Sequence, residues 1–208
     1  MTVFRLRTHR SQAAPAAPTI LLDWFTSDEG STIQVRESLT AGLMPPEQAM
    51  DFLRFSAADY CADRLTPRPA TWTRTMELEF AVRDVKTWRA VAAELSAALS
   101  FLSGDKWRLA PMPSSELSHP TALPRQDVDA VCLFSGGLDS LAGAVDLLAE
   151  GKKVCLVAHY EGGQAPKVQL HVAQLLARRF GADRVVLRRL FLRPSAAAAR
   201  QPRPLPDT

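Results

Sequence analysis

The sequence predicts an α/β protein in two parts: a parallel β-α-β-α-β domain over residues 126–192, preceded by a smaller α+β domain over residues 1–110. Beyond residue 126, apolar strand patterns alternate regularly with amphipathic helical patterns, which is typical of a parallel sheet with helical crossovers. Before residue 110, strand and helix patterns occur without that regular alternation. Residues 111–125 are rich in proline and serine, the composition of a linker between two domains.

The overall composition is that of a soluble globular protein. The chain has 208 residues, of which 47% are hydrophobic, and a net charge of +3. No apolar run approaches the roughly 18 residues that a membrane span needs, so we expect no membrane partner and a cytoplasmic location. The cysteines, Cys61, Cys132 and Cys155, are widely spaced and form no C-x-x-C pair, which indicates neither a disulfide framework nor a zinc site.

Positive charge is concentrated at the C-terminal end. From Arg178 onward there are eight arginines and two aspartates, a net +6, so the first 177 residues carry the difference of −3. Such a cluster could attract phosphate or nucleic acid, and the alternative is a solvated helix end followed by a flexible tail. Residues 193–208 contain four prolines and four consecutive alanines without apolar periodicity, which predicts a disordered tail.

Several segments of the first domain have strand patterns. Residues 75–82 alternate apolar and polar side chains, as a half-buried strand does. Shorter strand patterns occur at residues 3–7, 19–24 and 32–36. We therefore expect several strands in this domain.

Two helices complete the expected first domain. One should begin at Pro45-Pro46, because proline is tolerated at the first helical position. The other should follow Asp84, which can cap it, and should end at Gly104. The tryptophans near these helices could shape a ligand surface, but we predict that they pack in the core. They are Trp72, Trp88 and Trp107.

The second domain should contain three strands and two helices. The strands are expected at residues 128–134, 154–159 and 184–190, and the helices at residues 138–150 and from Gln164 or Pro166 to Phe180. Ligands of such sheets bind beyond the carboxyl ends of the strands, where both distinctive loops of this domain fall. Three strands are too few for a typical doubly wound domain, so the domain looks incomplete.

The first distinctive loop is Ser135-Gly136-Gly137-Leu138-Asp139-Ser140, between an apolar strand and a helix. Strand, glycine loop and helix is the geometry in which backbone N–H groups converge on an anion. A kinase-type phosphate loop would place a lysine after the glycines, but here a carboxylate, Asp139, occupies the loop. Amides and hydroxyls could therefore hold a pyrophosphate leaving group, while Asp139 holds Mg²⁺ directly or through water. The alternative is a tight turn in which Asp139 caps the helix.

The second distinctive loop follows the next strand. Tyr160 could stack on a nucleic-acid base and Gln164 could hydrogen-bond one, while Gly162 and Gly163 permit close approach. A plain strand-to-helix turn is the alternative. His159 could act as a general acid or base, although a single histidine at a strand end is more often structural.

The string Ser135–Ser140 resembles the SGGxDS signature of the PP-loop, or N-type, ATP pyrophosphatases. The resemblance implies an adenine nucleotide α hydrolase-like fold, incomplete in this chain. It also implies cleavage of ATP between the α and β phosphates: a substrate oxygen attacks the α-phosphorus, pyrophosphate leaves, and a nitrogen or sulfur nucleophile then displaces AMP. Asp139 and Ser135 would be catalytic, the whole string would bind ATP and pyrophosphate, and Asp139 would bind Mg²⁺.

Residues 158–164, AHYEGGQ, resemble the DYGQ segment of the 7-cyano-7-deazaguanine synthases of queuosine biosynthesis (QueC-type enzymes). His159 stands in place of that family's aspartate, and Glu161 is inserted before the Gly-Gln pair. This resemblance implies an adenine or substrate pocket that contains Val157, His159, Tyr160, Gly163 and Gln164.

A third resemblance covers parts of residues 60–110. Trp72-Thr73-Arg74, Trp88 and residues 101–107 resemble the leader region of QueC-like proteins found in anti-phage defence operons (QatC-like proteins). It implies a protein partner from the same operon. Nothing after Leu192 resembles the arginine-bearing loop or the zinc-binding cysteine cluster of the biosynthetic synthases, so we expect a truncated chain.

Together these resemblances predict a QueC-like ligase that uses ATP and Mg²⁺. It would activate a deazaguanine-type carboxylate by adenylation, for amide or nitrile formation or for transfer to a protein amine, in anti-phage defence. One alternative is a PP-loop tRNA-modifying enzyme of the thiolation or lysidine type, which the arginine-rich end favours. Another is an inactive, truncated nucleotide-binding fragment.

Overall fold

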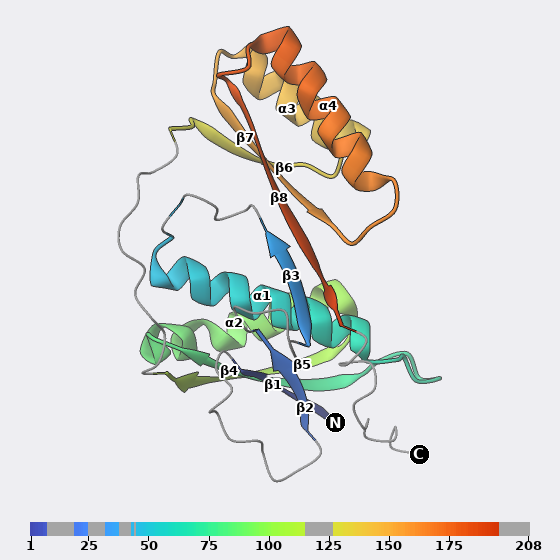
Figure 1. The fold of residues 1–208 in the computed structure, drawn as a ribbon. Coiled ribbons are helices and arrows are strands. Elements are labelled where there is room, and N and C mark those ends of the chain that lie inside the picture. The colour runs from blue at the N-terminus through green and yellow to red at the C-terminus, as the bar shows by residue number, and fades with distance from the viewer. Residues whose placement is uncertain (8–18, 25–31, 38–42, 44, 115–126, 196–208) are drawn as a thin grey trace. The chain divides into compact units, whose positions relative to one another are not determined.

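The chain forms two compact units in the computed structural model (Figure 1). The first unit comprises Met1–Gln34, Pro45–His119 and Arg193–Thr208, and the second comprises Val35–Met44 and Pro120–Leu192. The structure describes residues 1–7, 19–24, 32–37, 43, 45–114 and 127–195. The expected linker beyond residue 114 and the expected tail beyond residue 195 lie outside this range.

The first unit contains a four-stranded sheet. Its strands are β1 (Thr2–Arg7), β2 (Thr19–Asp23), β4 (Thr75–Val82) and β5 (Lys106–Pro113), in the order β2-β1-β4-β5. The three described pairings, β1 with β2, β1 with β4 and β4 with β5, are all parallel. The expected α+β class is therefore wrong, and this unit is α/β, because the chain returns from β4 to β5 through a helix as parallel pairing requires.

β5 includes Pro111, which was expected in the linker. Proline cannot donate to a strand ladder and is found mainly on edge strands. β5 lies at the edge of its sheet, next to β4 only among the described strands. That position accommodates Pro111 and the strand's final residue, Pro113.

Both helices of the first unit cover the same face of its sheet. They are α1 (Glu47–Leu65) and α2 (Val85–Ser103). The Phe80 ring of β4 lies 5.0 Å from the Phe55 ring of α1 and 5.2 Å from the Trp88 ring of α2. The expected helix ends are confirmed: Asp84 accepts a hydrogen bond from the Thr87 N–H at 3.1 Å, and Gly104 ends α2 with a φ of +73°. Of the three tryptophans, Trp88 and Trp107 are buried, whereas Trp72 is 64% exposed, contrary to prediction.

A buried ion pair joins the ends of the helices to the sheet. Arg74 donates to Asp105 through its backbone N–H at 2.9 Å and its Nε at 3.1 Å. The same guanidinium donates to the carbonyls of Thr66 and Asp63 at 2.7 and 2.9 Å, at the C-terminal end of α1. Burial opposes the ionisation of Asp105, but the hydrogen bonds and charge of Arg74 outweigh it and hold the pKa of Asp105 below its ordinary value.

The second sheet has the order β3-β8-β7-β6 and contains the predicted strand–helix alternation. Its elements are β3 (Ile33–Glu37), β6 (Ala130–Leu133), α3 (Leu138–Ala149), β7 (Val154–Tyr160), α4 (Ala165–Phe180) and β8 (Val185–Pro194). The pairings of β7 with β6 and with β8 are parallel. The chain is thus α/β in both units, and the pairings β1–β2, β1–β4, β4–β5, β6–β7 and β7–β8 are parallel.

The N-terminal strand pattern at residues 32–36 forms β3, which lies next to β8 rather than in the first sheet as expected. β8 also runs past residue 193, where the disordered tail was expected to begin. Beside this strand, the Ser195 N–H donates to the Thr32 carbonyl at 2.8 Å, and Arg193 Nε donates to Gln34 Oε1 at 2.9 Å. Hydrogen bonds to a segment distant in sequence therefore order the start of the expected tail.

Both helices of the second unit, α3 and α4, pack on one face of its sheet (Figure 1). The core between them contains Phe134, Leu148, Leu156 and Leu176. On β6 the alternate side chains, Val131 and Leu133, point to the other face and are 65% and 80% exposed. None of the helices in the described part of the chain has the length and apolar character of a membrane-spanning segment.

Candidate functional site

The Ser135–Ser140 loop joins β6 to α3 at the carboxyl end of the strand. Phe134 anchors its start, because this side chain is buried and its N–H donates to the Val157 carbonyl of β7 at 2.7 Å. Gly136 has a φ of +87°, a conformation that favours glycine. A Cβ atom at Gly136 would also lie 3.4 Å from Gln169 Cγ and from Val168 Cγ1 of α4. The backbone conformation therefore favours glycine here, while a Cβ atom would make only a close van der Waals contact with α4.

The two serine hydroxyls of the loop contact each other across the turn. Ser135 Oγ lies 3.1 Å from Ser140 Oγ and accepts a hydrogen bond from the Gly137 N–H at 3.2 Å. Ser140 Oγ donates to the Gly137 carbonyl at 3.0 Å, so its oxygen can accept the Ser135 proton. These bonds bring both hydroxyls to the start of α3.

The N-cap residue of α3 is Gly137, and no side-chain cap hydrogen bond is made from this position. In the first turn, the N–H groups of Leu138, Asp139 and Ser140 are those that a helix leaves without an internal acceptor. Asp139 is exposed and makes no capping hydrogen bond, so the alternative role as a helix cap is not observed. Leu138 is also exposed, at 80%. An anion at this turn would meet N–H groups and the helix dipole.

The second loop, after β7, has two glycines with positive φ, +151° at Gly162 and +74° at Gly163. Tyr160 ends β7, with its ring 5.5 Å from the Phe191 ring and 5.7 Å from the Arg189 guanidinium carbon of β8. Gln164 is exposed and precedes the first residue of α4. Tyr160 therefore already has neighbours within the unit, while Gln164 remains accessible from solvent.

His159 is tied to the neighbouring strand. Its Nε2 lies 3.0 Å from the Leu192 carbonyl, which accepts a hydrogen bond when that nitrogen carries the proton. Val157, two residues earlier on the same face of β7, is half-buried. The structure thus gives His159 a structural contact.

Gln169, a residue that the sequence analysis did not single out, links the two loops. Its side chain is 1% exposed, and its Nε2 donates to the Ser135 carbonyl at 3.3 Å and to the His159 carbonyl at 3.0 Å. Its Oε1 has no hydrogen-bond partner among the described residues. A sequence signal existed, because Gln169 falls on the inward stripe of α4 with Ala173 and Leu176, where a polar residue is unusual. The predicted site residues at the two strand ends are thus neighbours.

No protein-family model, curated protein or solved structure matches this chain. The functional assignment therefore depends on the residues of the site themselves.

A metal ion would find few ligands here. Within the described ranges, no group of three or more histidine, cysteine, aspartate or glutamate side chains could hold one. Asp139 is the carboxylate of the loop, and Mg²⁺ is commonly held by one or two carboxylates together with the phosphates of its substrate. The residues fit Mg²⁺ that arrives with a nucleotide better than a resident metal. The cysteines are free, and burial raises the pKa of Cys61 to about 12 and also raises that of Cys155.

Proposed function

We propose that the Ser135–Ser140 loop binds the phosphates of ATP and that the chain belongs to an enzyme that releases pyrophosphate. The observation that carries this proposal is the start of α3, where two serine hydroxyls and the first-turn N–H groups meet without a side-chain cap. Helix N-termini preceded by glycine loops at the carboxyl ends of parallel strands are common phosphate sites.

Different groups of the loop would bind the phosphates and the Mg²⁺ ion. The N–H groups of the first turn and the hydroxyls of Ser135 and Ser140 would hold phosphate oxygens. Asp139 would repel a bare polyphosphate but would bind the Mg²⁺ that accompanies it, and this ion would neutralise charge on the leaving group. No lysine or arginine lies between Ser135 and Glu150, so positive charge for γ-phosphoryl transfer is missing from the loop and its helix. Cleavage between the α and β phosphates agrees better with this composition.

For the reaction we propose adenylation of a deazaguanine-type carboxylate. A carboxylate oxygen attacks the α-phosphorus of ATP, the bond to the β-phosphate oxygen breaks, and pyrophosphate leaves. An amine then attacks the acyl carbon and AMP leaves, which gives an amide, with a nitrile or a modified protein amine as the further possibilities. The substrate class is supported by the resemblance of residues 158–164 to QueC-type enzymes, and a partner from a defence operon by that of residues 60–110. Tyr160 and Gln164 would contact the base.

The test measures pyrophosphate and orthophosphate separately after incubation with Mg²⁺, ATP and 7-carboxy-7-deazaguanine. We expect pyrophosphate, and a loss of roughly 10²-fold when Asp139→Asn removes one preorganised charge. Asp146→Asn, at an exposed position of α3 outside the loop, is the matched control and should keep full activity. Release of orthophosphate, or equal activity of the Asp139→Asn protein, would contradict the proposal.

ATP binding can be tested without turnover. A nucleotide at a hundred times its Kd stabilises the protein that binds it by about 2.7 kcal/mol. We expect Mg²⁺-ATP to raise the Tm of the wild-type chain but not that of a Ser135→Ala, Ser140→Ala double variant. Stabilisation without pyrophosphate release would favour the alternative of an inactive nucleotide-binding fragment.

RNA modification is a second candidate, because arginines are frequent after residue 178. Arg184, however, donates to the carbonyls of Leu148 and Lys152 at 2.5 and 3.0 Å, which is a structural role. Arg178 and Arg179 are exposed on α4 and remain available for phosphate contacts. Steeply salt-dependent tRNA binding that Arg178→Glu abolishes would favour this candidate.

A further inference from the structure

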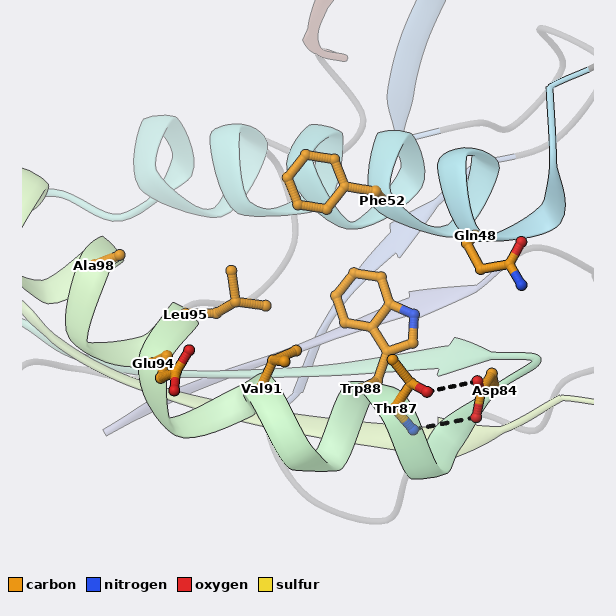
Figure 2. Close-up of a pocket in the computed structure, with 9 residues that line it drawn as sticks. All are labelled: Gln48, Phe52, Asp84, Thr87, Trp88, Val91, Glu94, Leu95 and Ala98. Atoms are coloured by element: carbon orange, nitrogen blue, oxygen red, sulfur yellow. Dashed lines mark hydrogen bonds between the residues drawn. The ribbon is translucent and has the colours of Figure 1, made fainter.

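A groove of about 520 Å³ lies between the two helices of the first unit, distant in sequence from the phosphate loop (Figure 2). Gln48 and Phe52 of α1 line one side of it. Trp88, Val91 and Leu95 of α2 line the other. Its surface is predominantly apolar, and volumes of this size are typical of binding sites.

The apolar lining of the groove belongs to helices that leave large side chains exposed. Phe52 is 53% exposed and Val91 is 36% exposed, while Trp88 is buried beneath them at 7%. The Phe52 and Trp88 rings are stacked at 6.3 Å, and Trp88 also contacts the Phe55 and Phe80 rings. Trp88 therefore packs against three aromatic rings and forms the base of the groove.

The groove is elongated. Its lining follows α2 from Asp84 to Ala98, which corresponds to about 21 Å along a helix axis. Leu102 lies one turn beyond Ala98 on the same stripe and is 78% exposed. The apolar surface thus extends further than a compact small molecule needs, and its length matches that of a helix of about four turns.

The ionisable side chains that line the groove are all negatively charged. Asp84 and Glu94 are the charged side chains that line it, and no lysine or arginine does. Hydrogen bonds from the Thr87 side chain and backbone lower the pKa of Asp84, so this carboxyl stays charged. A second copy that docked through the same groove would bring like charges together, whereas a basic occupant would be attracted.

We propose that this groove binds an amphipathic helix of a partner protein, with an apolar stripe against Trp88 and Val91 and with lysine or arginine beside Asp84 and Glu94. The binding mode is a helix in a groove, in which apolar residues at positions i, i+3, i+4 and i+7 supply the anchors. This proposal is independent of the nucleotide site.

The test uses the full chain and two labelled synthetic 18-residue peptides, one of leucine and lysine in helical periodicity and one of leucine and glutamate. By fluorescence anisotropy we expect the lysine peptide to bind at least tenfold more tightly. Phe52→Ser and Val91→Asp, both at exposed positions, should weaken binding of the lysine peptide tenfold or more, while the circular dichroism spectrum of each variant stays unchanged. Leu175→Ser, at a 46% exposed position of α4, is the matched control and should bind as the wild type does.

Charge reversal gives an independent readout. Glu94→Lys should lower the affinity for the lysine peptide and raise the affinity for the glutamate peptide. Equal affinity for both peptides, or binding that Val91→Asp leaves unchanged, would overturn the proposal. It would also be overturned if sedimentation showed a dimer that Val91→Asp dissociates, because the groove would then belong to a second copy of the chain.

Discussion

Asp59 should make the stability of the first unit depend on pH. This carboxyl lies in α1, and burial together with the charge of Asp63 raises its pKa from 3.8 to about 7. Among the described residues, none forms a hydrogen bond or ion pair with it. Ionisation of Asp59 in the folded chain is therefore opposed without local compensation.

The direction in which stability changes with pH follows from the number of protons bound by the folded and unfolded states. Between pH 4 and pH 7 the folded state holds a proton on Asp59 that the unfolded state has lost, so stability decreases as the pH rises through this range. The contribution of protonated Asp59 to the free energy of unfolding is complete below about pH 4 and is lost above about pH 7. A difference of about three pH units corresponds to roughly 4 kcal/mol, which is an upper value because Asp59 is not completely buried.

Asp59→Asn removes this titration while keeping the size of the side chain. We expect the free energy of unfolding of the variant to exceed that of the wild type by up to about 4 kcal/mol at pH 8 and to equal it near pH 4. Urea unfolding followed by tryptophan fluorescence is the suitable assay, because all four tryptophans belong to the first unit. Asp146→Asn in the second unit is the control. Parallel stability curves for Asp59→Asn and the wild type between pH 5 and pH 8 would refute the reasoning.

Further predictions concern a buried ion pair and the phosphate loop. Asp105→Ala leaves the buried Arg74 without its main partner and should cost roughly 3–5 kcal/mol in the same unfolding assay. Gly136→Ala should weaken ATP binding in calorimetry, because its φ of +87° is strained for a residue with a Cβ atom, whereas Gly143→Ala, which has no such φ and open space at its Cβ, should not. Gln169→Leu removes both links between the loops and should speed amide exchange at Gly137 in hydrogen-exchange experiments.

Local sequence patterns were sufficient for most of the second unit. The apolar runs and helical stripes after residue 126 correspond to β6, α3, β7, α4 and β8, because their periodicity and glycine stops act over neighbouring residues. The Ser135–Ser140 turn was likewise predicted as a strand-to-helix loop, and the structure has it there. Its function stays a proposal.

Other features depend on contacts that local patterns do not contain. The strand β3 was recognised, but its place beside β8 is decided by a partner about 150 residues later in the chain. The α+β prediction failed for the same reason, since strand direction is set by pairing and not by side-chain alternation. Gln169 was passed over because its importance lies in two carbonyls that only the fold brings near it.

The strand β6 has consequences for handling the protein in solution. Among the described strands its only neighbour is β7, and its outward side chains, Val131 and Leu133, are largely exposed. The unpaired N–H and C=O groups of an edge strand are a template for pairing between molecules, and exposed apolar side chains favour it, so concentrated samples should self-associate through this edge. Val131→Lys would place a charge at the free edge, as natural sheets often do, and should raise the concentration at which light scattering detects aggregates.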